Sequence, residues 1–264
     1  MTDPIAAPSG LIDSHAHVWD RTCEMVRGAR YHPDYEATID TYLGVLDAHG
    51  IERAVLVQPS FLGTDNSYLL ACLRAHPDRL RGIVVLDPGT TGTEMDDLTA
   101  EGVIGLRYNL LSLPPAWLAK PEYQVLTQLA VQRDWWVEVQ VHGPDWPFVL
   151  PMLSHAPLMV DHFGKPGDVP CAGFEALLTR DPASTCVKLS APYRQTAVDL
   201  RLTARRLITH FGAERCLWGS DWPWTQHENH HGYADTIHWL QDWTTPEQRQ
   251  VICRDAPNLL GFGA

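Results

Sequence analysis

Short apolar segments alternate with amphipathic stretches along most of the chain, and this alternation restricts the fold more than any other feature. The segments are rich in Val, Ile, Leu and Trp, which is typical of strands buried on both faces of a parallel sheet. Between them apolar residues share one helical face, as Tyr42, Leu43 and Leu46 do. The strand candidates are Leu11–Ser14, Arg53–Val57, Gly82–Leu86, Val103–Arg107, Trp136–Val141, Leu158–Asp161, Thr185–Leu189 and Arg215–Gly219.

About eight strand–helix units in 264 residues predict an α/β chain folded as one (β/α)8 TIM-type barrel. An open doubly wound sheet is the alternative. Neither G-x-G-x-x-G nor G-x-x-x-x-G-K-[ST] follows a strand candidate, so dinucleotide and nucleotide binding lack their sequence signature. No linker divides the chain, and we expect an N-terminal arm over residues 1–10 and a single barrel over residues 11–264.

The charge balance and the cysteines limit the partners and the compartment. The chain has 20 Lys and Arg against 32 Asp and Glu, a net charge of −12, and no basic block. This excludes nucleic acids and anionic membranes as partners, and no apolar run reaches the roughly 18 residues of a membrane span. The first residues do not resemble a signal peptide, and the six cysteines are isolated from one another. Together these features predict a cytoplasmic protein with reduced thiols. The sequence contains no pattern that indicates an oligomeric state.

Four of the polar residues at strand ends form a candidate site. His15 and His17 project to the same side of an extended segment, because side chains alternate along a strand. His162 follows the candidate Leu158–Asp161, and Asp221 follows the last candidate. Since the first and last strands of a closed barrel are neighbours, the three imidazoles and the carboxylate would meet at one mouth. The alternative for the two N-terminal histidines is a polar loop without chemistry.

A second group of residues suits an anionic substrate. Arg107 ends one strand candidate, and Arg194 follows Tyr193 after another. A guanidinium binds a carboxylate through two parallel hydrogen bonds, so we predict that Arg107, Arg194 and Tyr193 bind substrate. Surface salt bridges and simple packing are the alternatives. The sequence fixes no role for Lys165, Tyr31 or the cluster His227, His230 and His231.

Three ordered segments resemble the amidohydrolase superfamily: Asp13-Ser14-His15-Ala16-His17, Asp161-His162-Phe163-Gly164-Lys165-Pro166 and Gly219-Ser220-Asp221-Trp222-Pro223. The similarity runs from about residue 11 to 261. It is strongest to the branch that contains 2-pyrone-4,6-dicarboxylate lactonase, sulfomuconolactone hydrolase, sugar-lactone hydrolases and galactarolactone isomerase. The resemblance implies a distorted (β/α)8 barrel with its site at the carboxyl mouth.

The chain departs from the metal-dependent members of that superfamily. Where many of them carry a further histidine, this chain has Lys188 and Ser190. The strand candidate that carries Glu138 and Gln140 offers no lysine for a carboxylated bridge. One divalent ion, zinc or manganese, on His15, His17, His162 and Asp221 is chemically reasonable. The lactonase branch also contains enzymes that use no metal, so both alternatives stay open. Residues 82–106 contain no arginine, which argues against a dicarboxylated pyrone as the substrate.

The predicted function is hydrolysis of the lactone ring of a small carboxylated substrate. Asp221 would act as the base that activates water. His15, His17 and His162 would polarise the carbonyl, directly or through one metal ion. The alternatives are a zinc-dependent amidase or decarboxylase, a lactone isomerase, and a barrel that binds a small molecule without turnover.

Overall fold

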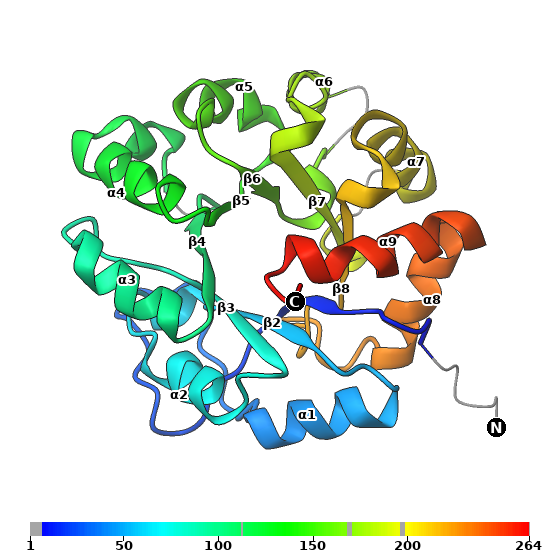
Figure 1. Cartoon of the computed structure of the whole chain (residues 1–264), viewed down its shortest axis with the longest axis horizontal. Helices are drawn as coiled ribbons and strands as arrows, with labels where there is room; N and C mark the ends of the chain where they lie inside the picture. The colour runs from blue at the N-terminus through cyan, green and yellow to red at the C-terminus, as the bar shows by residue number, and fades with distance from the viewer. Residues whose placement is uncertain (1–6, 112, 168–170, 196–198, 264) are drawn as a thin grey trace.

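The computed structural model describes residues 7–111, 113–167, 171–195 and 199–263, which form a barrel of parallel strands surrounded by helices (Figure 1). Eight strands are hydrogen-bonded in chain order from first to last, which confirms the predicted barrel over the open sheet. Most of the arm expected over residues 1–10 lies outside the described residues. The strands are β1 (Asp13–Ala16), β2 (Ala54–Val57), β3 (Leu80–Val84), β4 (Val103–Asn109), β5 (Trp136–Gln140), β6 (Leu158–Val160), β7 (Thr185–Ser190) and β8 (Cys216–Gly219).

The helices pack on the outside of the strands, and several begin at a capping side chain. Thr38 and Asp199 each accept a hydrogen bond from the first turn of their helix, and Thr91 forms a capping box with Glu94. Within the described residues, no helix has the length and apolar character that a bilayer crossing requires. The α-helices are α1 (Ile39–Ala48), α2 (Ser67–Ala75), α3 (Gly92–Ala100), α4 (Pro121–Val131), α5 (Trp146–Val149), α6 (Ala172–Leu177), α7 (Leu200–Phe211), α8 (Tyr233–Trp243) and α9 (Pro246–Leu259).

The ends of β1 and β8 are joined by backbone hydrogen bonds, which close the barrel. The N–H of Asp221 donates to the carbonyl of His15 at 2.8 Å, and the N–H of His17 donates to the carbonyl of Trp222 at 2.8 Å. A Cβ atom on Gly219 would lie 2.8 Å from the Cβ of His15. Because real Cβ atoms do not approach so closely, glycine is required where the last strand passes the first histidine.

The buried carboxylate of Asp13 adds a side-chain link across the same junction. Its Oδ1 accepts from the N–H of Ser220 at 2.8 Å. Its Oδ2 accepts from the hydroxyls of Tyr42 at 2.8 Å and Tyr233 at 2.7 Å. Burial raises the pKa of Asp13, although these donors oppose the shift. The carboxylate therefore ties β1, α1, α8 and the end of β8 together.

Apolar side chains fill one end of the barrel. Val55, Met159 and Leu217 from three strands pack with Leu260 and Phe262 from the C-terminal segment. Figure 1 shows α9 and the C-terminus crossing the ring of strands. Polar side chains lie at the opposite end of the barrel, at the carboxyl ends of the strands.

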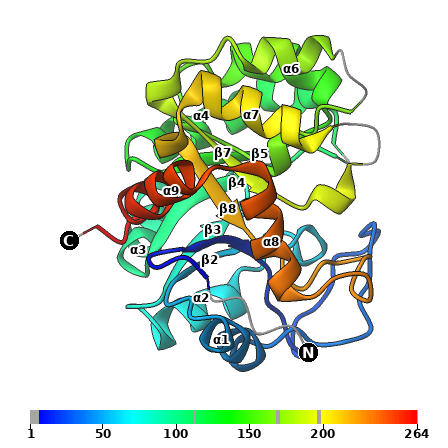
Figure 2. The same ribbon diagram turned by 90° about the vertical axis from the view of Figure 1, so that its right-hand side faces the viewer.

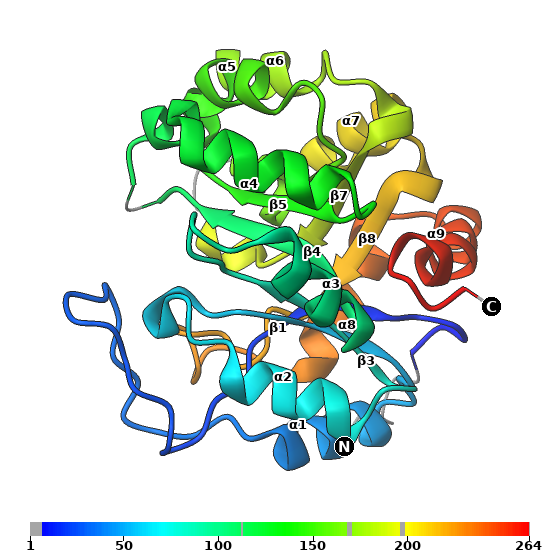
Figure 3. The same ribbon diagram turned by 60° about the vertical axis from the view of Figure 1, so that its left-hand side comes forward.

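Two long loops lie side by side at that opposite end. They cover residues 17–38 and 222–232, and both side views place them away from the C-terminus (Figures 2 and 3). The hydroxyls of Tyr31 and Tyr35 donate to Oε1 of Glu228 at 2.5 and 2.8 Å. A single carboxylate therefore fastens the first loop to the last.

All eight predicted strands are present, but some boundaries differ from the prediction. β1 begins at Asp13 instead of Leu11 and includes His15 and Ala16. β3 begins at Leu80 instead of Gly82, and β4 continues to Asn109. Apolar runs alone do not reveal these shifts, because pairing with a neighbouring strand decides where each ladder stops.

Candidate active site

A cavity of about 240 Å³ lies at the carboxyl ends of the strands. Its walls include His17 after β1, His162 after β6 and Asp221 after β8. Arg30 and Tyr31 contribute to it from the loop over residues 17–38. The cavity is therefore built where the sequence placed the candidate site, at the mouth of the barrel.

His17 and Asp221 lie at the floor of this cavity, and His15, which does not line it, is buried against both. Oδ1 of Asp221 lies 3.6 Å from Nε2 of His15 and 3.5 Å from Nε2 of His17. Nδ1 of His17 lies 2.7 Å from the carbonyl oxygen of Val57. A carbonyl only accepts, so Nδ1 carries a hydrogen, and Nε2 is the ring nitrogen that faces the carboxylate.

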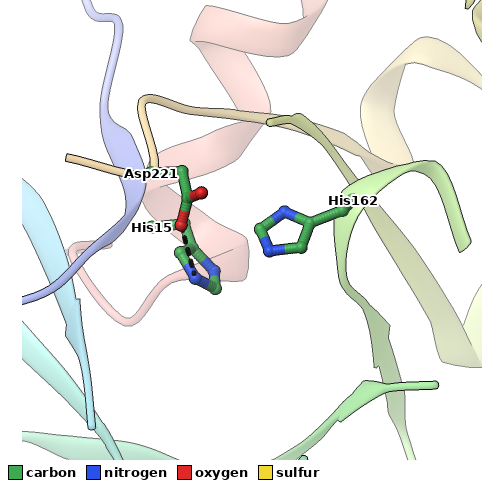
Figure 4. A group of neighbouring side chains, drawn as sticks. All are labelled: His15, His162 and Asp221. Atoms are coloured by element: carbon green, nitrogen blue, oxygen red, sulfur yellow. Dashed lines mark ion pairs between the residues drawn. The ribbon is translucent and has the colours of Figure 1, made fainter. Parts of the chain in front are cut away.

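His162 approaches the same point from the opposite wall. Figure 4 shows its ring directed toward His15 and Asp221, and the ring centres of His15 and His162 are 4.8 Å apart. Nδ1 of His162 lies 2.8 Å from Oγ of Ser190, which fixes the ring. His162 and Asp221 both have positive φ angles, 51° and 57°, which non-glycine residues seldom adopt. Such backbone geometry concentrates at functional sites.

The second oxygen of Asp221 is held by the residues predicted to bind substrate. Oδ2 accepts from the hydroxyl of Tyr193 at 2.5 Å and from Nε of Arg194 at 2.7 Å. Arg194 lines the cavity and also donates to the carbonyl and hydroxyl oxygens of Thr225. These contacts leave Oδ1 of Asp221 as the oxygen directed toward the histidines.

The protonation states follow from burial and neighbouring charge. Burial opposes ionisation of Asp221, but Arg194 and then His162 lower its pKa well below the usual range. Burial lowers the pKa of His162 to about 3. Burial, and then the charge of Lys188, lowers the pKa of His15 well below the usual range. At neutral pH the site therefore contains an ionised carboxylate beside two neutral imidazoles.

Arg107 belongs to a buried network beneath the site. Its Nε donates to Glu138 at 3.0 Å, its Nη1 to the carbonyl of Gln58 at 3.1 Å and its Nη2 to Gln140 at 3.0 Å. Only 3% of Arg107 is exposed, although its side chain also contributes to the cavity wall. The predicted substrate-binding residue thus already has partners for much of its guanidinium.

Lys188 is the second cation of this network. Its Nζ forms an ion pair with Glu138, lies 3.7 Å from Oδ1 of Asp161 and is 3.1 Å from Nδ1 of His15. Burial would raise the pKa of Asp161, but His15 and Lys188 lower it well below the usual range. The ammonium group therefore occupies the space between His15 and two buried carboxylates. The sequence singled out Lys188 only as a departure from the family.

Arg30 and Lys165 line the cavity, and neither forms an ion pair with a carboxylate in the described part of the chain. Arg30 is exposed at the rim. Lys165 is partly buried, and burial followed by the charge of Arg194 lowers its pKa to about 8. The sequence assigned no role to either cation, because ion pairing depends on neighbours far away in the chain.

Some of the remaining histidine and aromatic residues line the cavity, and others pack away from it. His227 lines the cavity, while the His227 and His231 rings lie 4.9 and 4.8 Å from the ring of Tyr193. The cavity lining is largely polar, and four tryptophans near the strand ends do not contribute to it: Trp19, Trp146, Trp222 and Trp224. Their ring N–H groups or faces pack within the protein, as Trp222 does against Tyr42.

The donor atoms at the floor fit one divalent ion. Nε2 of His15 is buried without a hydrogen-bond partner, and one ligand atom each from His15, His162 and Asp221 lie within 4.8 Å of one another. Ligands bound at about 2.1 Å to a tetrahedral ion are roughly 3.4 Å apart, close to the His–Asp distances given above. A second group, His15, Glu138 and Asp161, has similar spacing, but the ammonium of Lys188 lies among these residues.

Comparison with known proteins assigns the fold and site to a class. The amidohydrolase family profile matches residues 12–262, so this chain belongs to the amidohydrolase family. It is similar to the 4-sulfomuconolactone hydrolase of Rhizobium radiobacter, with 27% identity over 96% of this chain and 86% of that protein. It is also similar to the D-galactarolactone isomerase of Agrobacterium fabrum, with 25% identity over 90% of this chain and 87% of that protein.

A solved structure gives the same family placement. The chain superposes with a TM-score of 0.91 on a probable 2-pyrone-4,6-dicarboxylic acid hydrolase from Acinetobacter baumannii that has citric acid bound. The two sequences are 32% identical, and the match covers 96% of this chain and all of the other. Two of these similar proteins have a lactone substrate in their names, and the similar solved structure contains a bound polycarboxylate.

Proposed function

We propose that this chain hydrolyses the cyclic ester of a small carboxylated lactone. The observation that carries the proposal is the juxtaposition of Oδ1 of Asp221 with the Nε2 atoms of His15 and His17, 3.5 to 3.6 Å away. The adjoining cavity is lined by two cations, Arg30 and Lys165, that have no carboxylate partner among the described residues. Ester hydrolysis needs an activated water and a polarised carbonyl. An anionic substrate also needs positive charge, which a chain of net charge −12 concentrates here.

Asp221 would activate the water. A water in the cavity can donate a hydrogen bond to Oδ1 of Asp221, because the ionised carboxylate is an acceptor. Asp221 takes a proton as the water oxygen bonds to the lactone carbonyl carbon. When the ring C–O bond breaks, the same proton goes to the leaving oxygen, so the carboxylate is restored. Tyr193 and Arg194 hold Oδ2 and keep Oδ1 in place.

His162 would stabilise the negative charge on the carbonyl oxygen. When the Ser190 hydroxyl donates to Nδ1, the hydrogen of the neutral ring is on Nε2. That N–H can then donate to the developing oxyanion, a contact worth about 3 kcal/mol in comparable sites. A divalent ion bound to His15, His17, His162 and Asp221 would supply Lewis-acid polarisation of the same carbonyl.

Arg30 and Lys165 would bind the substrate carboxylate. Both line the cavity, and no carboxylate of the described residues neutralises either one. Arg107 and Arg194, which the sequence suggested for this task, are already hydrogen-bonded to Glu138 and Asp221. We therefore assign them to the positioning of catalytic groups. A cytoplasmic location is part of the proposal, because the six cysteines are free thiols.

The test is a screen of carboxylated lactones that records proton release and product spectrum together. Hydrolysis creates a new carboxylic acid, so one proton is released for each ring opened. Metal content is measured on the same preparation, and activity is compared before and after a chelator. If no member of the set releases acid above the Asp221→Asn background, lactone hydrolysis is ruled out.

Isomerisation is the second candidate, because one relative is named as a lactone isomerase. Oδ1 of Asp221 could remove a carbon-bound proton from the lactone in place of a water proton. The same screen separates the two reactions, since isomerisation changes the spectrum without releasing acid.

A further inference from the structure

A second cavity of about 390 Å³ adjoins the polar one at the barrel mouth. Arg30, Ser60, Arg107 and Asn109 line both cavities. These four residues therefore mark the place where the two spaces meet. We call the second cavity the apolar chamber, because most of its lining surface is apolar.

The apolar chamber is built from segments that follow β3 and β4 and from the first loop. Leu86 follows β3, Leu110 follows β4, and Trp117 and Tyr123 come from the segment before and within α4. Val26 comes from the loop over residues 17–38 and is 40% exposed. Large apolar side chains facing an open cavity gain free energy when a ligand covers them.

Two arginines, Arg30 and Arg107, lie at the junction of the cavities, while Arg27 and Asp87 line the apolar chamber alone. Arg30 lines both spaces and has no carboxylate partner among the described residues, whereas Asp87, an acid of the chamber, accepts from the N–H of Gly89 in its own turn. A carboxylate held at Arg30 would leave the rest of the same molecule free to extend into either space. The reactive ring would face Asp221, and an attached group would face Leu86 and Trp117.

We propose, building on the function proposed above, that the substrate carries an apolar substituent, aromatic or alkyl, that occupies the apolar chamber. The substrate class is therefore an amphipathic lactone acid: a charged ring on the Asp221 side and an apolar group on the Leu86 side. Chamber residues set specificity and take no part in the chemistry.

Two substitutions change the chamber and leave the catalytic groups untouched. Leu86→Trp fills the chamber, and Val26→Asn makes its exposed wall polar with little change in size. Leu202→Trp is the matched control, because Leu202 is 48% exposed on α7 and lines neither cavity. All variants are checked for an unchanged melting temperature.

Binding is measured by calorimetry with succinate and phenylsuccinate, which do not require turnover. We expect phenylsuccinate to bind about tenfold more tightly than succinate to the unaltered protein and to Leu202→Trp, a ratio typical of a well-filled apolar site. The ratio should fall to near one in Leu86→Trp and decrease in Val26→Asn. Equal affinities in the unaltered protein, no binding of either acid, or an unchanged ratio in Leu86→Trp would overturn the proposal.

Kinetics with a pyrone carboxylate and its phenyl-bearing counterpart complete the test. The phenyl-bearing lactone should have about tenfold higher kcat/KM, and Leu86→Trp should abolish that advantage while it retains activity on the plain lactone. If neither lactone is hydrolysed but phenylsuccinate still binds selectively, the chamber is real and the proposed reaction is wrong. If both are hydrolysed equally by all variants, the reaction stands and the chamber assignment fails.

Discussion

Nε of Arg194 donates to Oδ2 of Asp221 at 2.7 Å, so the arginine and the catalytic candidate form one unit. The contact engages one oxygen and leaves the other to the histidines. It also keeps Asp221 ionised, because the guanidinium lowers its pKa. A residue that the sequence suggested for substrate recognition is therefore placed to orient the proposed base and keep it ionised.

Replacing this base should separate turnover from binding. We expect Asp221→Asn to lower kcat at least about a hundredfold, since it removes the proton acceptor, while KM changes little. Steady-state kinetics on the best lactone provide the measurement. Asp242→Asn is the matched control, because Asp242 forms an exposed pair with Arg201 far from the cavity. A kcat equal to that of the unaltered protein would remove Asp221 from the role of base.

The unpaired cations should control substrate affinity. Arg30→Gln and Lys165→Met should each raise KM for an anionic lactone about tenfold, because a charge-assisted hydrogen bond contributes roughly 1.5–3 kcal/mol. Their kcat values should stay within about threefold. Arg201→Gln, which removes an exposed arginine of α7, should leave KM unchanged. If KM rises equally for a neutral lactone, the two residues do not bind a carboxylate.

The dependence of kcat/KM on pH should reveal the loss of positive charge on Lys165. Its pKa is about 8, so the side chain is positive below that pH and neutral above it. For an anionic lactone kcat/KM should therefore fall as the pH rises through about 8, after correction for spontaneous alkaline hydrolysis. Lys165→Arg keeps the charge at higher pH and should shift the descending limb upward. An identical limb in Lys165→Arg would assign the titration to another group.

Lys188 should be essential for stability, because it neutralises carboxylates inside the barrel. Lys188→Met leaves Glu138 and Asp161 with Arg107 as the nearest cation. Removing one partner from a buried ion pair costs about 3–5 kcal/mol of unfolding free energy, which urea denaturation can measure. Lys120→Met, an exposed control beside Trp117, should cost under about 1 kcal/mol. A similar small loss for both variants would contradict the assigned charge balance.

Gly219 should tolerate no side chain. In Gly219→Ala the new Cβ would meet His15, so the junction of β1 and β8 must shift. We expect a loss of about 1–3 kcal/mol in stability and a marked fall in kcat, because His15 and Asp221 lie on the two sides of that junction. Gly44→Ala, in the exposed face of α1 where a Cβ meets nothing within 4 Å, should be neutral or stabilising. Full activity of Gly219→Ala would show that the junction adapts.

The sequence predicts the barrel and the four catalytic candidates for a local reason. His162 and Asp221 each follow an apolar strand, His15 lies within the first strand, and parallel strands bring their carboxyl ends to one place. The predictions fail where the outcome depends on distant partners. Nothing local shows that Arg107 is engaged by Glu138 or that Arg30 remains unpaired. The predicted starts of β1 and β3 differ from those in the structure for the same reason, because hydrogen bonding to the neighbouring strand decides where a strand begins.

Asp13 and Ser220 are 207 positions apart and are joined by one hydrogen bond. During synthesis on the ribosome His15 and His17 emerge early, and Asp221 emerges only after all eight strands. A nascent chain therefore holds these imidazoles without the carboxylate that lies beside them in the folded protein. Under the proposed function, activity would then report that the last strand is in place, because no fragment lacking that strand contains the proposed site.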